Sequence, residues 1–381
     1  MAKKKSAAPS EESRPVAPEL PLKKRLLFGA ILGLGLLIAF EGLGRVVYHQ
    51  LFDAKKDLML QAFFGLGGNY SPNMVSNFIP HHYLVYVLNP NTKANHEKYF
   101  GDQPGHYVNG AGYRGKDFAI KKAPGTYRIV CLGGSTTFGL YETDETKTYP
   151  AQLEAELSRR FASPSFEVIN AGTPGWSSAE DLINLAFRVL ELEPDLILTY
   201  EGVNDVFAMR NQEEGRSDYS LFRRQVYFRP PGPFVRSLIG PSLGLRVLYY
   251  YWYGPENIGF DINTLAVRKP PPDYEQRLDT ATGKFLERNL VNLVAVAKAN
   301  NVIPALVTMG HGPWHRAIDR TAEINRKVAA ERGALLIDFE KQSRPEFFTG
   351  DRIHLTREGN LALARYIAEQ LSQAGLPFVP R

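Results

Sequence analysis

Beyond Tyr127 the chain alternates between short apolar segments and longer amphipathic segments, and this alternation is the strongest constraint on its fold. The short segments have the length and β-branched content of buried strands, whereas the longer ones repeat with helical periodicity. This alternation predicts an α/β fold with a parallel five-stranded sheet that helices cover on both faces. Strands are expected at 128–132, 166–170, 196–200, 302–308 and 335–338, and helices at 149–161, 179–192, 283–300, 319–332 and 356–374.

A serine follows the first predicted strand, at the edge of the sheet where functional residues gather in such folds. Ser135 comes directly after Gly133 and Gly134, which stop the strand and allow a tight turn. A serine on such a turn has an exposed hydroxyl and backbone N–H groups able to bind an oxyanion. The same sequence would also suit a simple turn in which Ser-Thr caps the next segment.

Three further motifs lie at the same predicted edge. Residues 170–178, Asn-Ala-Gly-Thr-Pro-Gly-Trp-Ser-Ser, follow the second strand, and Asn204 follows the third within Gly-Val-Asn-Asp. Asp351 and His354 form Asp-x-x-His before the last helix. Taken singly, each motif has a structural explanation as turn glycines, a helix cap or a surface histidine. Their presence together at one edge favours a functional site.

The four motifs, in this order, resemble the four blocks of the SGNH (GDSL-type) hydrolase superfamily over about residues 127–375. The resemblance implies a flavodoxin-like three-layer α/β/α sandwich. It also implies an enzyme that hydrolyses carboxylic esters, thioesters or sugar O-acetyl groups, or that transfers acyl groups. One departure is Gly134, because the namesake motif of the family has Asp at that place.

The resemblance also implies roles for individual residues. Ser135 matches the nucleophile, and Asp351 and His354 match the other two members of a catalytic triad. The backbone N–H groups of Ser135 and Gly175 and the side chain of Asn204 match the oxyanion hole. For the second block, Gly172 is an alternative that fits the spacing from Asn170-Ala171 less well than Gly175 does.

The chemistry of these residue types agrees with such roles. A serine hydroxyl needs a base to attack a carbonyl carbon at neutral pH, and the pKa of histidine suits that task. An Asp three residues before the His can reach its Nδ1 and fix the tautomer. No metal and no organic cofactor is required for this reaction.

The N-terminal residues differ in character from the rest of the chain. Residues 1–25 are rich in Lys, Ser, Pro and Glu, which predicts a disordered tail, and they carry +4 of the net charge of +5. The remaining chain is therefore almost neutral, which argues against nucleic acid as a partner. The single cysteine, Cys131, lies in the first predicted strand, where a buried structural thiol is expected.

An apolar segment at 26–48 predicts a transmembrane anchor. Its first 15 residues are uncharged, and its whole length of about 34 Å at 1.5 Å per residue is enough to cross a bilayer. Glu41 and Arg45 interrupt the segment but can pair on one helix face. The basic residues Lys23 to Arg25 before the span place the N-terminus in the cytoplasm and the following residues outside it, in the periplasm or at the cell surface. A cleavable signal peptide and a buried helix are the alternatives, although no Ala-x-Ala-like cleavage site follows.

Two segments surround the predicted catalytic core of residues 126–375. Residues 49–125 predict an irregular connection with short β elements, including a hairpin signal at Asn109-Gly110. An aromatic and proline-rich insertion at about 207–283 begins beside Asn204. It is interpreted as a substrate lid, as a membrane contact around 221–228, or as a structural subdomain.

The remaining histidines give weaker signals. His311 follows the fourth predicted strand, where it is either a substrate contact or a structural loop residue. His81 and His82 are expected to be exposed polar residues, because the sequence offers no matching metal ligands beside them.

The sequence as a whole predicts a membrane-anchored serine ester hydrolase whose catalytic domain lies outside the cytoplasm. Its expected substrates are O-acyl groups of envelope glycans, lipid esters or other small esters. An O-acyltransferase that modifies an extracytoplasmic polysaccharide would use the same acyl-enzyme and stays open as an alternative. A non-catalytic member that binds a glycan or a partner protein is a third possibility, although a binding module has no need of all five matched residues. The sequence points to no particular protein partner.

Overall fold

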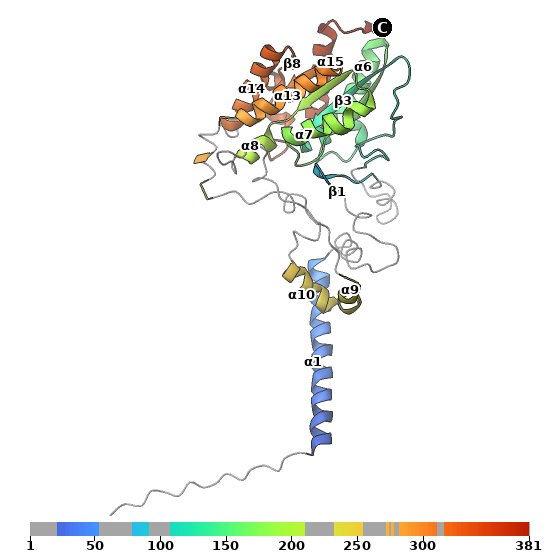
Figure 1. Ribbon diagram of the computed structural model, residues 1–381, viewed down its shortest axis with the longest axis vertical. Coiled ribbons are helices and arrows are strands. Elements are labelled where there is room, and N and C mark those ends of the chain that lie inside the picture. The colour runs from blue at the N-terminus through green and yellow to red at the C-terminus, as the bar shows by residue number, and fades with distance from the viewer. Residues whose placement is uncertain are drawn as a thin grey trace, which may run out of the picture.

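The computed structural model describes residues 21–52, 78–90, 107–209, 232–253, 272–273, 276–277, 282–310 and 316–380. Its core is a parallel five-stranded sheet with the strand order β5-β3-β6-β7-β8 (Figure 1). The predicted α/β class and strand number are therefore confirmed. The strands are β3 (Thr126–Gly133), β5 (Ser165–Asn170), β6 (Leu196–Tyr200), β7 (Ile303–Val307) and β8 (Leu335–Ile337).

Helices cover both faces of this sheet because successive strand side chains point to opposite sides. Ile129 and Cys131 of β3 contribute to the core beneath α6 and α15, whereas Val130 and Leu132 contribute to the core beneath α7 and α13. The helices are α6 (Tyr149–Arg160), α7 (Ser178–Asn184), α13 (Lys284–Ala299), α14 (Arg316–Arg332) and α15 (Arg357–Gln373). The helix predicted at 179–192 is divided, since α7 continues as a π-helical turn, Leu185–Val189, and a 3-10 turn, Leu190–Leu192.

The strand order decides where a site can form. The chain starts in β3, moves to β5 on one side and then crosses to β6 on the other. This is the flavodoxin-like order, and its switch point lies between the carboxyl ends of β3 and β6. Two short helices begin at these ends, α5 (Ser135–Phe138) after β3 and α8 (Val203–Met209) after β6. The fold therefore brings the first and third sequence motifs together.

Smaller elements pack around the sheet. The hairpin of β1 (Phe78–His81) and β2 (Val85–Leu88) lies against the loop after β5, where the Tyr86 hydroxyl donates to the Pro174 carbonyl at 2.7 Å. At the predicted Asn-Gly turn, Val108 and Arg114 form an isolated antiparallel bridge. The others are β4 (Phe161–Ser163), β9 (Val379–Pro380) and 3-10 turns at Glu145–Lys147, Phe339–Gln342 and Pro345–Phe347.

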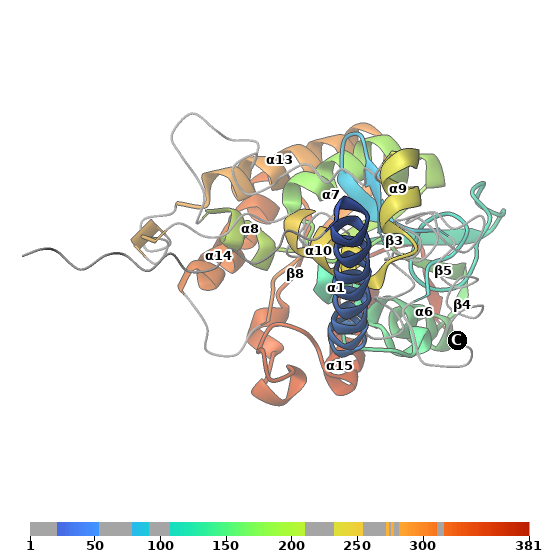
Figure 2. The ribbon, with the colours of Figure 1, turned by 90° about the horizontal axis from the view of Figure 1, so that it is seen from below.

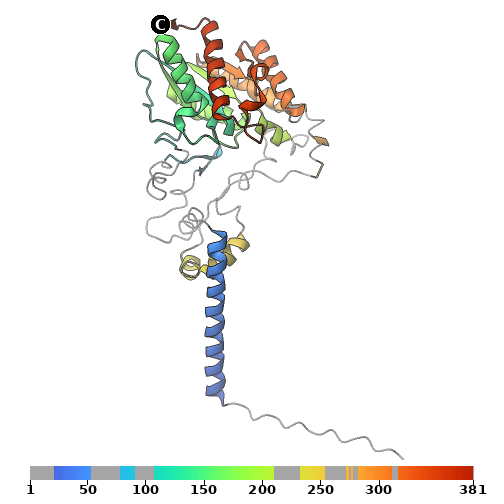
Figure 3. The ribbon, with the colours of Figure 1, turned by 180° about the vertical axis from the view of Figure 1, so that it is seen from behind.

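One long apolar helix, α1 (Leu22–Leu51), extends away from the sheet domain (Figures 1 and 3). The mean hydropathy of its most apolar 18-residue window is 2.2, and none of that window is buried. By length and composition α1 can cross a membrane, although signal sequences share these properties.

The predicted insertion contributes two described helices, α9 (Pro233–Ile239) and α10 (Leu243–Tyr253). Both flank one end of α1, as the view nearly along α1 shows (Figure 2). The α10 helix packs against α1, and residues of α9 pack against the same apolar cluster. The interpretation of the insertion as a substrate lid stays a prediction, because most of residues 207–283 lie outside the described residues. Residues 221–228, where a membrane contact was considered, and His311 lie outside the described residues.

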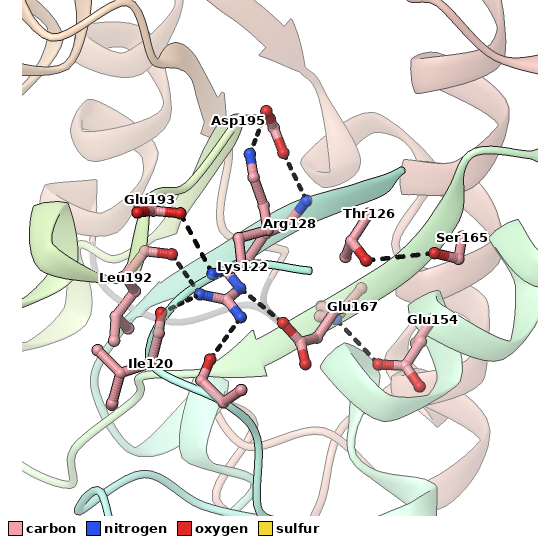
Figure 4. A network of polar contacts seen from close by, with 12 residues as sticks. Ile120, Lys122, Thr126, Arg128, Glu154, Ser165, Glu167, Leu192, Glu193 and Asp195 are labelled. Atoms are coloured by element: carbon pink, nitrogen blue, oxygen red, sulfur yellow. Dashed lines mark hydrogen bonds and ion pairs between the residues drawn. The ribbon is translucent and has the colours of Figure 1, made fainter. Parts of the chain in front are cut away.

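A buried arginine ties together the amino ends of the strands, opposite the switch point (Figure 4). The Arg128 side chain is 1% exposed and donates from Nε to Glu167 Oε2 at 2.6 Å. Its other guanidinium nitrogens donate to the carbonyl oxygens of Ala119, Ile120 and Leu192. The guanidinium thus provides hydrogen-bond donors for the Glu167 carboxylate and for three backbone carbonyl groups. Without it these groups would lack a partner in a place where water has little access.

We predict that Arg128→Met destabilises the protein by about 3–5 kcal/mol, because it leaves the half-buried Glu167 carboxylate and three backbone carbonyl groups without their donor. The matched control is Arg159→Met, which removes a pair with Glu156 from a side chain that is 67% exposed. A surface pair of that kind contributes about 0–1 kcal/mol. Denaturant unfolding of the detergent-solubilised chain measures both, and equal losses in the two variants would contradict the assigned role of Arg128.

Candidate active site

The turn that presents Ser135 requires glycine at position 133. Gly133 has φ of +149°, a conformation that side chains disfavour. A Cβ on this residue would lie 2.3 Å from Thr137 Oγ1 and 2.5 Å from the Tyr200 carbonyl oxygen. Only glycine therefore lets β3 end so close to β6, with α5 beginning at Ser135 immediately afterwards.

Gly134 is required for a different reason, because its φ of −86° is ordinary. A Cβ here would lie 2.5 Å from Asn204 Nδ2 and 2.9 Å from Glu201 Oε2. The space that an Asp of the namesake motif would need is occupied by side chains from the end of β6. The departure from that motif thus has a steric explanation in this chain, and it leaves Ser135 in place.

Ser135, His354 and Asp351 form a continuous chain of hydrogen bonds. Ser135 Oγ lies 2.7 Å from His354 Nε2, and His354 Nδ1 lies 2.6 Å from Asp351 Oδ2. The three residues come from two distant parts of the sequence, separated by 219 positions between serine and histidine. The structure therefore brings these three predicted residues together in the order that the sequence analysis anticipates.

The protonation state of Asp351 determines the direction of these bonds. Burial raises the pKa of Asp351, but hydrogen bonds from the backbone N–H groups of Ile353 and His354, and from the His354 and Thr349 side chains, outweigh it. The resulting pKa is about 2. An ionised carboxylate can only accept hydrogen bonds, so Nδ1 of His354 carries a proton. In the neutral imidazole, Nε2 is then the acceptor that faces the Ser135 hydroxyl.

Asn204 connects the two loops beside the serine. Its Nδ2 donates to the Trp176 carbonyl oxygen at 2.6 Å, so its amide faces the loop after β5. The neighbouring Asp205 accepts from Ser178 Oγ at 2.5 Å and from Ser178 N at 3.0 Å. Both side chains thus bind residues between the end of β5 and the start of α7. These hydrogen bonds account for the presence of Asn204 and Asp205 better than a capping role at the start of α8 does.

The two candidate glycines of that loop have different surroundings. The Gly172 N–H donates to Asn170 Oδ1 at 3.0 Å, and a Cβ on Gly172 would lie 2.3 Å from the Phe138 nitrogen. Gly172 therefore serves the packing of the loop against α5. Gly175 has φ of +81° and directly precedes Trp176, whose carbonyl oxygen accepts from Asn204. A Cβ on Gly175 would lie 2.6 Å from the Tyr86 hydroxyl. The preference for Gly175 over Gly172 as an oxyanion donor stays a prediction.

Two buried acids that the sequence motifs did not predict lie behind the site. Glu201 is 2% exposed and Asp181 is fully buried. Burial is the main cause that raises the pKa of both; repulsion from Asp181 and Asp205 adds to it for Glu201, and repulsion from Asp205 and Glu180 adds to it for Asp181. The neutral form is favoured, which lets an acid side chain lie beside the Asn204 amide without placing a charge there. The position of Glu201 directly after a predicted strand is the signal that could have identified it; Asp181, inside a helical pattern, gave none.

An aromatic ring also borders the histidine. The rings of Tyr141 and His354 meet edge to face with centroids 5.0 Å apart, and Tyr141 is 61% exposed. Arg357 binds Glu142 through two hydrogen bonds of 2.7 and 2.9 Å, which joins the Tyr141 loop to the start of α15. Tyr141 lies in a loop without a recognisable pattern, so its position beside His354 could not be predicted from the sequence.

The described residues outside this site offer no metal centre. Among them, no group of three or more His, Cys, Asp or Glu side chains has the arrangement of a metal site. His81 accepts from the backbone N–H groups of Tyr83 and Leu84 through Nδ1, as a loop histidine does. Cys131 is fully buried, and burial raises the pKa of its thiol well above the usual range. The thiol is therefore a packing group.

Comparison with known families assigns the chain. The model of the GDSL-like lipase/acylhydrolase family matches residues 131–362, which is more than half of the sequence. The chain belongs to this family. It is therefore a hydrolase that acts on ester bonds. A search of curated proteins finds no match to the chain.

Solved structures similar to this hydrolase share little of its sequence. The structure of TesA has 16% identity, covers 65% of this chain and 98% of its own, and has a TM-score of 0.41. The lipase/acylhydrolase from Enterococcus faecalis has 16% identity, covers 67% and 98%, and has a TM-score of 0.42. A catalytic mutant of Axe2, an acetylxylan esterase from Geobacillus stearothermophilus, has 16% identity, covers 66% and 96%, and has a TM-score of 0.38. At these TM-scores the family assignment rests on the sequence model of the family.

We predict that Asp351→Asn changes the tautomer of His354 in this hydrolase. The amide NH₂ that replaces Oδ2 would donate a hydrogen bond to Nδ1, so the imidazole proton would move from Nδ1 to Nε2. The protonated Nε2 could then no longer accept a hydrogen bond from the Ser135 hydroxyl. Nitrogen NMR of the imidazole, assigned with His354→Gln, should show the change, and fluorophosphonate labelling of Ser135 should slow by about 10⁴-fold. An unchanged tautomer with normal labelling would show that Asp351 does not orient the histidine.

Proposed function

We propose that the protein is a membrane-anchored serine ester hydrolase in which Ser135 is the nucleophile, His354 the general base and Asp351 the group that orients the imidazole. The observation that carries this proposal is the unbroken pair of hydrogen bonds, 2.7 Å from Ser135 to His354 and 2.6 Å from His354 to Asp351. Ser135 as a residue is only 9% exposed, so the structure buries it more than the sequence predicted for an exposed hydroxyl.

The reaction proceeds in two halves. His354 Nε2 takes the proton of the Ser135 hydroxyl as Oγ attacks the ester carbonyl carbon, and the same nitrogen returns the proton to the departing alcohol. The acyl group is then bound to Ser135 as an ester. Water, deprotonated by His354, attacks this acyl-enzyme, the acid leaves, and the proton returns to Ser135. Throughout both halves the ionised Asp351 stabilises the imidazolium that forms.

We assign the oxyanion hole to the backbone N–H groups of Ser135 and Gly175 and to the side chain of Asn204. An amide nitrogen has two N–H donors, and in Asn204 one of them is held by the Trp176 carbonyl oxygen. This bond fixes the amide plane and directs the second N–H to the substrate. A donor of this kind stabilises the transition state by about 3 kcal/mol.

The membrane context supports an envelope ester as the substrate. The basic residues Lys23 to Arg25 precede the apolar helix α1, which favours a cytoplasmic N-terminus and an extracytoplasmic catalytic domain. Esters in that compartment include O-acyl groups of glycans and lipid esters. The exposed ring of Tyr141 beside His354 offers an apolar surface to a sugar face or an acyl chain.

We predict that Ser135→Ala abolishes turnover of p-nitrophenyl esters by the full chain in detergent and leaves its melting temperature within a few degrees of the wild type. The substitution removes one oxygen and preserves the packing of α5, so folding should be retained. A fluorophosphonate probe should label the wild-type protein at Ser135. Labelling at another residue, or residual turnover at the wild-type rate, would refute the assignment.

The same assay separates hydrolysis from acyl transfer. In a hydrolase, an added polysaccharide should leave the rate of p-nitrophenol release unchanged and carry no acyl group at the end of the reaction. Acylated polysaccharide, absent with Ser135→Ala, would assign the protein as an O-acyltransferase that uses the same acyl-enzyme.

We predict that α1 places the catalytic domain outside the cytoplasm. In a bacterial host, alkaline phosphatase fused after residue 60 should be active, because this enzyme folds only after export. Green fluorescent protein fused at the same point should be dark. The reverse pattern, or a shortened soluble product in place of a membrane-bound chain, would contradict an uncleaved anchor.

A further inference from the structure

The contact between α1 and the insertion occurs at a defined depth along α1. About 20 apolar residues are needed to cross the hydrocarbon core of a bilayer. Counted from Leu26, directly after the basic residues, such a span ends at Arg45. The ion pair of Arg45 with Glu41, 3.4 Å between Nε and Oε1, lies at this boundary, and α10 meets α1 at the same level.

Glu41 fixes the start of α10 against α1. Its Oε2 lies 2.6 Å from Ser242 Oγ, and its Oε1 accepts from the Leu243 N–H at 3.1 Å. A carboxylate at the start of a helix binds its unpaired N–H groups and complements its dipole. About one turn further along α1, Gly44 faces Gly244 so closely that a Cβ on Gly44 would lie 2.3 Å from the Gly244 Cα. The depth of α10 relative to α1 is thus determined by direct contacts.

Each of the two helices presents an exposed apolar face. On α10, Leu248, Tyr251 and Trp252 lie at i, i+3 and i+4 and therefore share one side of the helix. Phe234 and Leu238 have the same relation on α9. Trp252 is 82% exposed and Phe234 79%, and neither set contains a charged residue. Large apolar side chains that are exposed together on adjacent helices indicate a surface that is covered by lipid or by another protein.

We propose that α9 and α10 lie in the interfacial layer of the bilayer where α1 leaves it, with Phe234, Leu238, Leu248, Tyr251 and Trp252 inserted among lipid headgroups and the first acyl carbons. The proposal rests on the proposed membrane span of α1. Aromatic side chains, Trp and Tyr above all, favour this layer because one part of the ring is apolar and another part can bind water.

Lipid is favoured over a protein partner because the two faces continue an existing lipid-facing surface. Leu43 and Val46 of α1, at the level where α10 packs, are 66% and 56% exposed. The apolar surface of α1 and the apolar faces of α9 and α10 therefore meet at one level of the molecule. A surface of this composition binds membranes through buried apolar area and lies in the plane of the interface.

Spin labels on the full chain in phospholipid nanodiscs test the proposal. Cys131 is the single cysteine of the sequence and is fully buried, so introduced cysteines are labelled selectively. Nitroxides at Trp252→Cys and Phe234→Cys are compared with Leu32→Cys on α1 and Phe187→Cys on the catalytic domain. Leu32 and Phe187 are 65% and 66% exposed and serve as the lipid and water references. The measurement is the collision rate with oxygen, which enriches in lipid, and with a water-soluble nickel chelate.

The expected result is a loss of nickel access at Trp252 and Phe234 relative to Phe187, with an oxygen-to-nickel ratio between those of the two references. Nickel access equal to that of Phe187 would overturn the proposal, provided that Leu32 reports lipid. Low access to both reagents, or spin–spin broadening, would overturn it too, because the faces would then be covered by protein or by a second copy. If Leu32 itself reports water, the span of α1 fails and the proposal fails with it.

A matched pair of glycine variants tests whether α1 sets the depth. Gly44→Leu should push α10 away from α1 and raise nickel access at Trp252. Gly42→Leu, where a Cβ has no atom within 4 Å, should leave nickel access unchanged. An equal effect of both variants would overturn the role of the contact between Gly44 and Gly244.

Discussion

The absence of a Cβ at two successive positions is the constraint on which the site depends. At Gly133 a Cβ would collide with Thr137 and with the backbone of β6, and at Gly134 it would collide with Asn204 and Glu201. Because neither residue has one, the end of β3 lies directly against the end of β6. Ser135 then begins α5 beside the side chains that follow β6. Van der Waals contact at the switch point, together with the pairing of Gly133 with Tyr200, thus decides where the serine lies.

Some carboxyl groups near the site are ionised and others favour the neutral form, and the surroundings of each group determine its protonation state. Asp351 accepts hydrogen bonds from two backbone N–H groups and two side chains, which lower its pKa to about 2 and keep it ionised. Glu201 and Asp181 are enclosed by protein, and burial together with repulsion from neighbouring acids raises their pKa and favours the neutral form. The ionised acid faces the imidazole that acquires a positive charge in the proposed mechanism. The neutral acids lie behind the serine, where an added negative charge would oppose formation of an oxyanion.

Stability and chemistry are located at opposite edges of the same sheet. The buried Arg128 joins Glu167 and three backbone carbonyl groups at the amino ends of the strands. All the residues that we propose for catalysis lie at or beyond the carboxyl ends. The described helices of the insertion have separate contacts, because α10 packs on α1 and α9 packs on the same apolar cluster.

The sequence alone determined the order and kind of the elements of the sheet domain, because apolar periodicity records which residues face a core. β6 has the predicted bounds, and the other strands differ by one or two residues at an end. The four motifs also identified Ser135, Asp351 and His354 as a group, since parallel strands place their carboxyl ends at one edge. The catalytic roles of these residues, and of Gly175 and Asn204, remain predictions.

Only the tertiary structure decided the rest. It decided that Glu201 and Asn204 fill the space beside Gly134, that Tyr141 borders His354, and that α10 packs on α1. Each of these contacts joins segments that are far apart in the sequence or lie in loops. Their positions are set by the packing of neighbouring elements, which the local pattern of residues does not record.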